Sequence, residues 1–493
     1  MASLSGVALA LGLLALTGAG IWLTWRRPFL GIGLLVAGLA FHSFVLMWLI
    51  HLGTPTPLVR AVQAWKEVLL LVLVAGVGWR IWKARQVGLR SMVATDWIAL
   101  AFALVATVYF VLPSSLLHSG VNFSQRLVGY RIEILIPLVY FVGRLVDATG
   151  DRQRLAFMWL SLGAAAVVTL FGVFELFAVP TRVWLDWGVN QYTAFLGFKY
   201  QGPAGLPENF FLTLPNGSLI RRMVSTYISP LGIAYTALLL FPMAVAVMDR
   251  RVSQRTAGWI AILTTLLILG VVLSITRLAL FGLVGEAILL VLVLRRAWIV
   301  SLVPVLVVAA LVSVFPYTTI APAVDRNLGI VHGVGLEWGF ANDSSSREHY
   351  GYLVQDVKFD LQHPLGLGTG ASTLRYGKLV GTGESAVLGM FGDLGAAGGG
   401  LYLALYLLSV WNGWRALRVT RRVSLEEMLP LIAFVGGLGL LPITMTSDVW
   451  GDLSVTFLFW WAAGASATLS RRAVRTVPRE NWHGREEEER IAA

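Results

Sequence analysis

The sequence predicts an all-α polytopic integral membrane protein. Of its 493 residues, 57% are hydrophobic and only 13% are charged, against roughly 25% charged residues in an average soluble domain. Apolar runs of about 20 residues, long enough to cross a hydrocarbon core of about 30 Å, recur along the whole chain. Because lipid offers no hydrogen-bond partner to a free backbone group, we expect these runs to be helices.

Cysteine is absent from the chain, which excludes a disulfide framework, a thiolate nucleophile and a cysteine-based metal site. The formal net charge of +11 would suit an anionic partner, but in a membrane protein arginine and lysine first reflect topology. No nucleic-acid-binding motif is present, so we expect no nucleic-acid partner. We also expect no cleavable signal, because the first basic pair, Arg26 and Arg27, follows the first apolar run.

The apolar runs predict about thirteen transmembrane helices, within a range of twelve to fourteen. In chain order they are 4–25, 28–50, 68–81, 97–112, 130–146, 155–179, 230–248, 257–276, 278–294, 299–315, 397–414, 429–446 and 455–469. The sequence contains no obvious repeat, low-complexity tract or soluble domain. Residues 1–470 are therefore predicted to form a single transmembrane domain, which includes the polar interruption 316–396.

The distribution of arginine and lysine predicts the orientation of these spans, because short loops rich in both residues tend to stay cytoplasmic. With the loop at Arg26 and Arg27 inside, every other short basic loop falls on the same side. The N-terminus and the large loop 316–396 are then extracytoplasmic, and the charged tail 471–493 is cytoplasmic.

A second set of basic residues falls on the outer side, where the same rule disfavours them. Arg277 occupies a tight corner between two spans, so it either extends to the headgroups or faces an internal polar cavity. Arg221 and Arg222 precede a helix start at which Ser225 and Pro230 suit the cap and first turn. This pattern predicts either an anion site at a helix N-terminus or a capped helix with interfacial basic anchors.

Three further ionisable groups lie in or beside predicted spans. If Arg131 pairs with Glu133 it is mainly structural, and otherwise it is available for a phosphate. Glu286 and His42 lie inside predicted spans, where an ionisable group is either functional or buried with a partner.

The large loop 316–396 contains a predicted amphipathic helix. Ser345, Ser346, Arg347 and Glu348 have the spacing of a capping box, and apolar residues then recur at helical intervals up to Pro364. We expect this helix to lie on the membrane or over a cavity. The glycine-rich turn 363–370 follows it, and because it lacks the Lys-Ser/Thr ending of a Walker motif we do not assign it to a nucleotide.

Glu384 stands just before the next helical run. A carboxylate there either caps the helix, where the helix dipole favours it, or acts as a general base on a rigid helix end. His332, His349 and His363 are weaker base candidates, and they lack a metal-ligand spacing.

The order of these segments resembles the O-antigen ligase and polymerase superfamily, the Wzy/WaaL-like proteins of bacterial surface-polysaccharide assembly. The resemblance covers roughly 66–469. It rests on the segments 126–144, 222–230 and 274–277, and on 346–395 within a large outer loop late in the chain.

The resemblance implies a membrane-embedded inverting glycosyltransferase of the metal-independent, GT-C-like class that uses sugars linked to lipid pyrophosphate. Arg277 and Arg222 match the family's arginine positions best, so they are expected to hold the pyrophosphate of an undecaprenyl-linked donor. Ligases of this family typically have a His-Asn pair where this chain has Glu384 and Ser385. That departure favours a polymerase in which Glu384 deprotonates the acceptor hydroxyl. The expected catalytic residues are therefore Glu384 and Arg277, with Arg222, Arg131, Arg221 and Arg347 on the pyrophosphate, and His363 and Tyr227 as secondary candidates.

We expect no metal or cofactor. The expected partners are the lipid-linked oligosaccharide donor, a glycan acceptor, the lipid bilayer and other polysaccharide-assembly proteins, and the expected location is the bacterial inner membrane with the active site facing outward. Two alternatives remain open: a ligase that transfers the finished glycan to lipid A core or another acceptor, and a transporter or flippase of lipid-linked oligosaccharide. Transporters often show internal repeats, and their absence here favours the enzyme.

Overall fold

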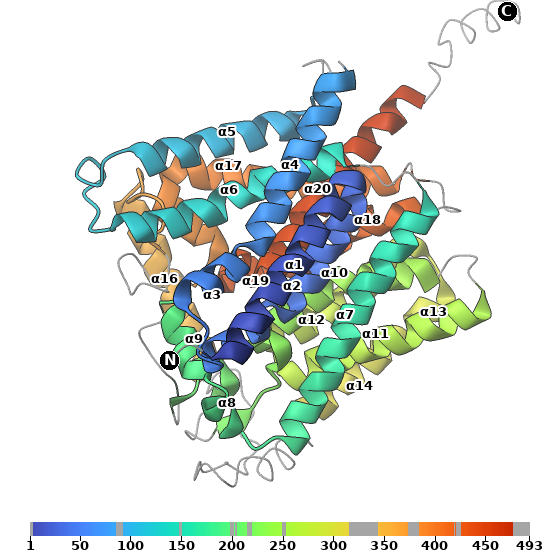
Figure 1. Ribbon diagram of the computed structural model, residues 1–493. Coiled ribbons are helices and arrows are strands. Elements are labelled where there is room, and N and C mark those ends of the chain that lie inside the picture. Colours follow the sequence, from blue (N-terminus) through green and yellow to red (C-terminus); the bar gives the residue numbers. More distant parts are fainter. Residues whose placement is uncertain are drawn as a thin grey trace, which may run out of the picture.

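The computed structural model is a bundle of long helices (Figure 1) and describes residues 3–84, 92–146, 150–197, 202, 205–213, 219–248, 253–314, 344–372, 384–418, 420 and 425–476. Ten helices of this part are long and apolar enough to cross a membrane. The prediction of an all-α polytopic membrane protein is therefore confirmed.

The ten candidate spans comprise nine single helices and one composite segment. They are α1 (Leu4–Arg26), α2 (Pro28–His51), α5 (Ala94–Val111), α7 (Asp151–Ala178), α10 (Pro230–Met248), α11 (Gln254–Ser274), α12 (Arg277–Leu294), α17 (Ala386–Leu417), the segment Leu425–Thr446, and α20 (Leu453–Thr476). The composite segment Leu425–Thr446 consists of η7 (Leu425–Glu427), α18 (Met428–Leu431), the π-helical turn η8 (Ile432–Gly436) and α19 (Gly437–Thr446).

The remaining elements are shorter or more polar. They are α3 (Thr56–Gln63), α4 (Trp65–Ala84), α6 (Phe123–Leu145), α8 (Val183–Asp186), α9 (Val189–Phe195), α13 (Ala297–Val300), α14 (Leu302–Val314), α16 (Ser344–Gln362), η3 (Glu208–Phe210), η4 (Ser225–Tyr227), η9 (Val449–Gly451), and the antiparallel strands β1 (Phe211–Thr213) and β2 (Leu219–Arg221). Three predicted spans fall here, on α4, α6 and α14. Helix α4 has charged residues near both ends, α6 is interrupted by charged residues, and α14 has only 13 residues.

Helix α17 begins at Ala386, inside the segment predicted to be an outer loop, and its backbone leaves helical geometry at Gly395 (φ 66°, ψ −174°). Figure 1 shows the N-terminus, α3, α8, α9 and α16 at one side of the bundle, and the C-terminal end of α20 at the other. The predicted tail 471–493 begins within α20, and 477–493 lie outside the described residues.

Two glycines let α6 and α20 pack closely at the centre of the bundle. A Cβ added to Gly143 would lie 2.1 Å from the carbonyl oxygen of Trp461, and one added to Gly464 would lie 1.9 Å from that of Tyr140. Real atoms do not approach so closely, so only glycine fits at either position.

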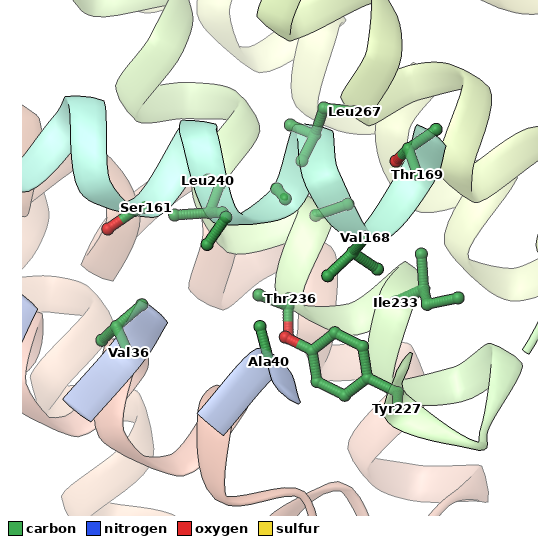
Figure 2. Close-up of a pocket in the computed structure, with 13 residues that line it drawn as sticks. Val36, Ala40, Ser161, Val168, Thr169, Tyr227, Ile233, Thr236, Leu240 and Leu267 are labelled. Atoms are coloured by element: carbon green, nitrogen blue, oxygen red, sulfur yellow. The ribbon is translucent and has the colours of Figure 1, made fainter. Parts of the chain in front are cut away.

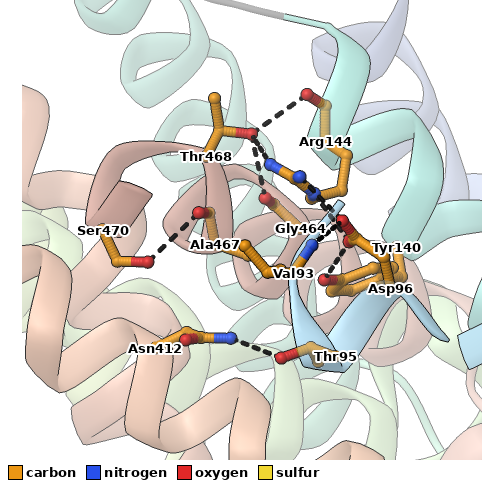
Figure 3. A network of polar contacts seen from close by, with 10 residues as sticks. All are labelled: Val93, Thr95, Asp96, Tyr140, Arg144, Asn412, Gly464, Ala467, Thr468 and Ser470. Atoms are coloured by element: carbon orange, nitrogen blue, oxygen red, sulfur yellow. Dashed lines mark hydrogen bonds and ion pairs between the residues drawn. The ribbon is translucent and has the colours of Figure 1, made fainter. Parts of the chain in front are cut away.

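A polar network closes the same contact at one end (Figure 3). The Arg144 guanidinium on α6 donates to both oxygens of Asp96 on α5, at 2.7 Å each, and to Thr468 on α20 at 2.8 Å. The Tyr140 hydroxyl donates to Asp96 at 2.7 Å. Since all these groups are largely buried, the two-pronged arginine contact ties the three helices together.

We expect Gly464→Ala to lower the thermal unfolding midpoint of the detergent-purified protein, because the added methyl group overpacks the α6–α20 contact at a cost of about 1–3 kcal/mol. The matched control is Gly285→Ala in α12, where an added Cβ meets nothing within 4 Å. Alanine normally stabilises a helix relative to glycine by about 0.5–1 kcal/mol, so this control should unfold at the same or a higher temperature. Equal midpoints for the two variants would contradict the assigned contact.

Candidate functional site

A buried carboxylate, Glu175 near the end of α7, organises the chain that leads into α10. Its Oε2 accepts hydrogen bonds from the Arg221 guanidinium at 3.0 Å and the Trp184 indole at 3.2 Å. Its Oε1 accepts from the backbone N–H groups of Val224 at 3.0 Å and Ser225 at 3.2 Å. Four donors therefore satisfy one buried charge and fix the path of 221–225.

Arg221 is one of the donors that hold Glu175 in place. Its side chain is 1% exposed, and it also donates to the carbonyl of Arg222 at 2.6 Å. The guanidinium lies over the ring of Phe210, 4.7 Å from its centroid. A buried arginine paired with a buried glutamate has a structural role, so we no longer assign Arg221 to the pyrophosphate.

Arg222 points instead to the corner between α11 and α12. Its Nε donates to the carbonyl of Ser274 at 2.8 Å, and its Nη2 donates to the hydroxyl of Thr276 at 3.0 Å. Thr276 is the N-cap residue of α12, and the half-buried Arg277 is the first residue of that helix. The segment of Arg222 and the segment of Arg277, which are far apart in the sequence, are thus adjacent in the fold.

The backbone around this contact is strained. Ser225, Ile228 and Ile275 all have positive φ, at 47°, 56° and 49°. Such a conformation is an outlier for a β-branched residue, and it persists only where the surrounding structure enforces it. Ile275 lies between the two residues that bind Arg222, and Ile228 precedes α10 by two residues. Strain of this kind clusters at functional sites.

The segment at Ser447 lies beside the start of α17, because the N–H of Ala386 donates to the carbonyl of Ser447 at 3.2 Å. Tyr235 on α10 is in electrostatic range of Arg222, Glu384 and Asp452. Arg222 and the candidate base Glu384 therefore share the wider surroundings of Tyr235.

Glu384 does not cap α17. The cap is Ser385, whose hydroxyl accepts from the N–H of Leu388 at 3.1 Å and donates to the carbonyl of Thr444 at 3.3 Å. Glu384 precedes that cap, and its Oε2 lies 2.8 Å from Nδ1 of His349 on α16. Both side chains are partly exposed, at 26% for Glu384 and 48% for His349, so the pair lies at the surface of the protein.

Tyr227 lies beside a small, mostly apolar pocket between α2, α7, α10 and α11 (Figure 2). Figure 2 shows its hydroxyl directed at Thr236, to which it donates a hydrogen bond at 3.4 Å. Burial and the neighbouring Asp452 carboxylate raise the pKa of Tyr227, and burial raises the pKa of Asp452 to about 6. The hydroxyl therefore stays protonated at neutral pH, as a hydrogen-bond donor or acceptor.

Arg131 belongs to a different cluster. It binds Glu67 at 2.6 Å rather than Glu133, and the neighbouring Lys66 contacts both Glu67 at 3.4 Å and His42 at 3.1 Å. His42 is thus buried with a polar partner, which is one of the two alternatives that the sequence analysis left open for it. Arg131 therefore has its own acidic partner, in a cluster separate from the contacts of Arg222.

The glycine-rich turn 363–370 is held by Asp393, at the break in α17. Asp393 accepts from the N–H groups of Gly370 at 2.9 Å and Ser372 at 2.7 Å. His363 lies exposed at the start of this turn, with its ring 4.4 Å from that of Phe359. The turn thus fastens the end of α16 to α17.

Three further predicted groups are not assigned to the site. The backbone of Arg347 lies in α16, but its side chain and His332 fall outside the described residues. Glu286 is fully buried against Gly439 of α19, and its two carboxylate oxygens have no hydrogen-bond partner within the described part.

The sequence interpretation missed Glu175, Tyr235, Asp452 and the role of His349. Only Glu175 carried a usable signal, since it is a lone carboxylate in the apolar run 155–179. Among the described residues, no group of three or more His, Asp or Glu side chains is arranged to hold a metal. A search of protein-family models finds no match, and no curated protein matches the sequence significantly.

The docking of α16 on α17 is expected to depend on pH. Burial, with the nearby Asp356 and Asp393, raises the pKa of Asp360 from 3.8 to about 7. Between pH 3.8 and about 7, Asp360 keeps its proton when α16 is docked and loses it when α16 is undocked. Docking therefore weakens as the pH rises through this range. Hydrogen exchange of α16, corrected for intrinsic rates, should be slower at pH 5 than at pH 8. Asp360→Asn should remove most of this difference in exchange between pH 5 and pH 8. Equal protection of α16 at both pH values in the wild-type protein would contradict the prediction.

Proposed function

We propose that this protein is a membrane glycosyltransferase that polymerises oligosaccharide repeat units linked to undecaprenyl pyrophosphate into O-antigen or exopolysaccharide. The reaction takes place on the outer face of the bacterial inner membrane and inverts the anomeric centre. The observation that carries the proposal is the Arg222 guanidinium bound at the corner where α12 begins with Arg277, with Glu384 and Arg222 both in electrostatic range of Tyr235. The resemblance described above supplies the donor class.

In this reaction an acceptor hydroxyl attacks the anomeric carbon of the donor sugar. The new C–O bond forms as the bond to the pyrophosphate breaks, and the hydroxyl proton passes to Glu384. The departing pyrophosphate carries the negative charge that develops, and the guanidinium groups of Arg222 and Arg277 stabilise it. Arg222 is oriented for this role in advance by its bonds to Ser274 and Thr276.

Two contacts of the Glu384 region support its proposed role as the general base. Because Ser385 supplies the helix cap, the carboxylate is not engaged by the first turn of α17. His349 fixes its Oε2 at 2.8 Å, which restricts the side chain to one orientation. A positioned base typically contributes a rate factor of about 10²–10⁴.

Arg277→Ala should reduce chain elongation by about 10²–10³-fold, because removal of one positioned donor to a developing oxyanion typically costs this much. Purified protein in proteoliposomes is supplied with a defined lipid-linked oligosaccharide, and the products are resolved by length. The matched control, Arg182→Ala, removes an exposed arginine that precedes α8 and should elongate normally. Undiminished polymer from Arg277→Ala would contradict a role in catalysis, and transfer to an added lipid A core without chain growth would identify the ligase alternative.

Glu384→Gln should lower the turnover rate by about 10²–10⁴-fold while donor binding stays within about threefold of wild type, because glutamine keeps the shape but cannot take up a proton. His349→Gln should cause a smaller loss of turnover, because its amide keeps a hydrogen-bond donor near Glu384. The measurement is steady-state elongation together with equilibrium binding of the lipid-linked donor. Equal losses of binding and turnover in Glu384→Gln would assign the residue to structure.

A further inference from the structure

Helix α16 directs polar side chains toward the protein beside Phe359, and large apolar side chains outward beside Lys358 and Gln362. Asp356 is 6% exposed against α17, and His349 contacts Glu384. The apolar residues Tyr350, Val357 and Leu361 are instead 69%, 44% and 77% exposed. A soluble surface helix shows the reverse arrangement, with its apolar side packed inward.

The exposed apolar side of α16 continues onto the outer surface of α5. Leu365, which follows α16, is 76% exposed, and its carbonyl accepts a hydrogen bond from the Tyr109 hydroxyl of α5 at 2.6 Å. Helix α5 is a candidate membrane span whose large exposed residues recur at helical spacing: Trp97, Leu100, Leu104, Val108 and Val111. The apolar residues of α16 therefore lie at the end of a surface that faces lipid along α5.

We propose that α16 is an interfacial helix whose stripe of Tyr350, Val357, Leu361 and Leu365 is inserted into the surface of the lipid bilayer. A bilayer that covers the exposed residues of α5 up to Val111 reaches the level of Leu365. Tyrosine at one end of the stripe suits the headgroup region, where its ring is apolar and its hydroxyl remains hydrated. Burial of large side chains at about 25 cal/mol per Å² of apolar surface favours this placement.

Membrane insertion would also fix the position of His349. This residue immediately precedes Tyr350, but on the helix it points to Glu384 while Tyr350 points outward. A helix anchored by lipid on one side and by the turn 363–370 at its end cannot easily rotate or lift away. The proposal itself does not depend on the glycosyltransferase activity, and it can fail or succeed separately.

The absence of cysteine in the chain allows a direct test. Leu361→Cys and the matched control Gln355→Cys each introduce a single label site, the first in the apolar stripe and the second at an exposed position on another side of α16. Each variant is labelled with an environment-sensitive fluorophore and reconstituted in vesicles of phosphatidylethanolamine and phosphatidylglycerol. Quenching is then measured with nitroxide lipids and with aqueous iodide.

We expect the label at position 361 to be quenched several-fold more by nitroxide lipid than the label at 355, and several-fold less by iodide. Iodide quenching at 361 equal to that at 355 would overturn the proposal, because the stripe would then face water. A label at 361 that is protected from both quenchers, with cross-links between copies of the unlabelled Leu361→Cys variant, would overturn it in favour of a protein–protein contact.

Discussion

The hydrogen bonds of the buried Glu175 carboxylate hold together the end of the bundle at which α7 meets the segment that leads into α10. A carboxylate buried among apolar helices is costly unless it is fully hydrogen-bonded, and here one guanidinium, one indole and two backbone N–H groups meet that need. Because the backbone N–H groups of Val224 and Ser225 donate to Glu175, the chain enters α10 through a strained turn instead of a regular helix start. That turn leaves Arg222 beside Thr276 and Tyr227 beside Thr236.

A second fixed point lies at the break in α17. The positive φ of Gly395 lets Pro364 and Leu365 lie directly against the interrupted helix, where a Cβ would clash with their backbone. Asp393 then fastens the turn that ends α16. The two fixed points have complementary effects. The first holds the segment that contains Arg222, and the second holds α16, which places His349 beside Glu384.

The sequence was sufficient for the membrane-spanning helices, because an apolar run of about 20 residues has few alternatives to a helix in lipid. It was less informative about the arginines. Arg221 and Arg222 are adjacent and chemically identical, yet one is paired to Glu175 and the other contacts Ser274 and Thr276. What separates them is a partner 46 residues away, and no local pattern records such a partner. The same reason explains why Glu67, and not the nearby Glu133, proved to bind Arg131.

Backbone strain marks the Arg222 corner in addition to charge. Left-handed geometry at an ordinary residue costs roughly 1–2 kcal/mol, and isoleucine bears that cost at both 228 and 275. Glycine at either position would remove the cost without a change of path. Both residues also end a helix, since Ile228 is the C-cap of η4 and Ile275 is the C-cap of α11. The contacts of Arg222 with Ser274 and Thr276 lie on either side of Ile275, so the residue that ends α11 and the oriented guanidinium form one unit.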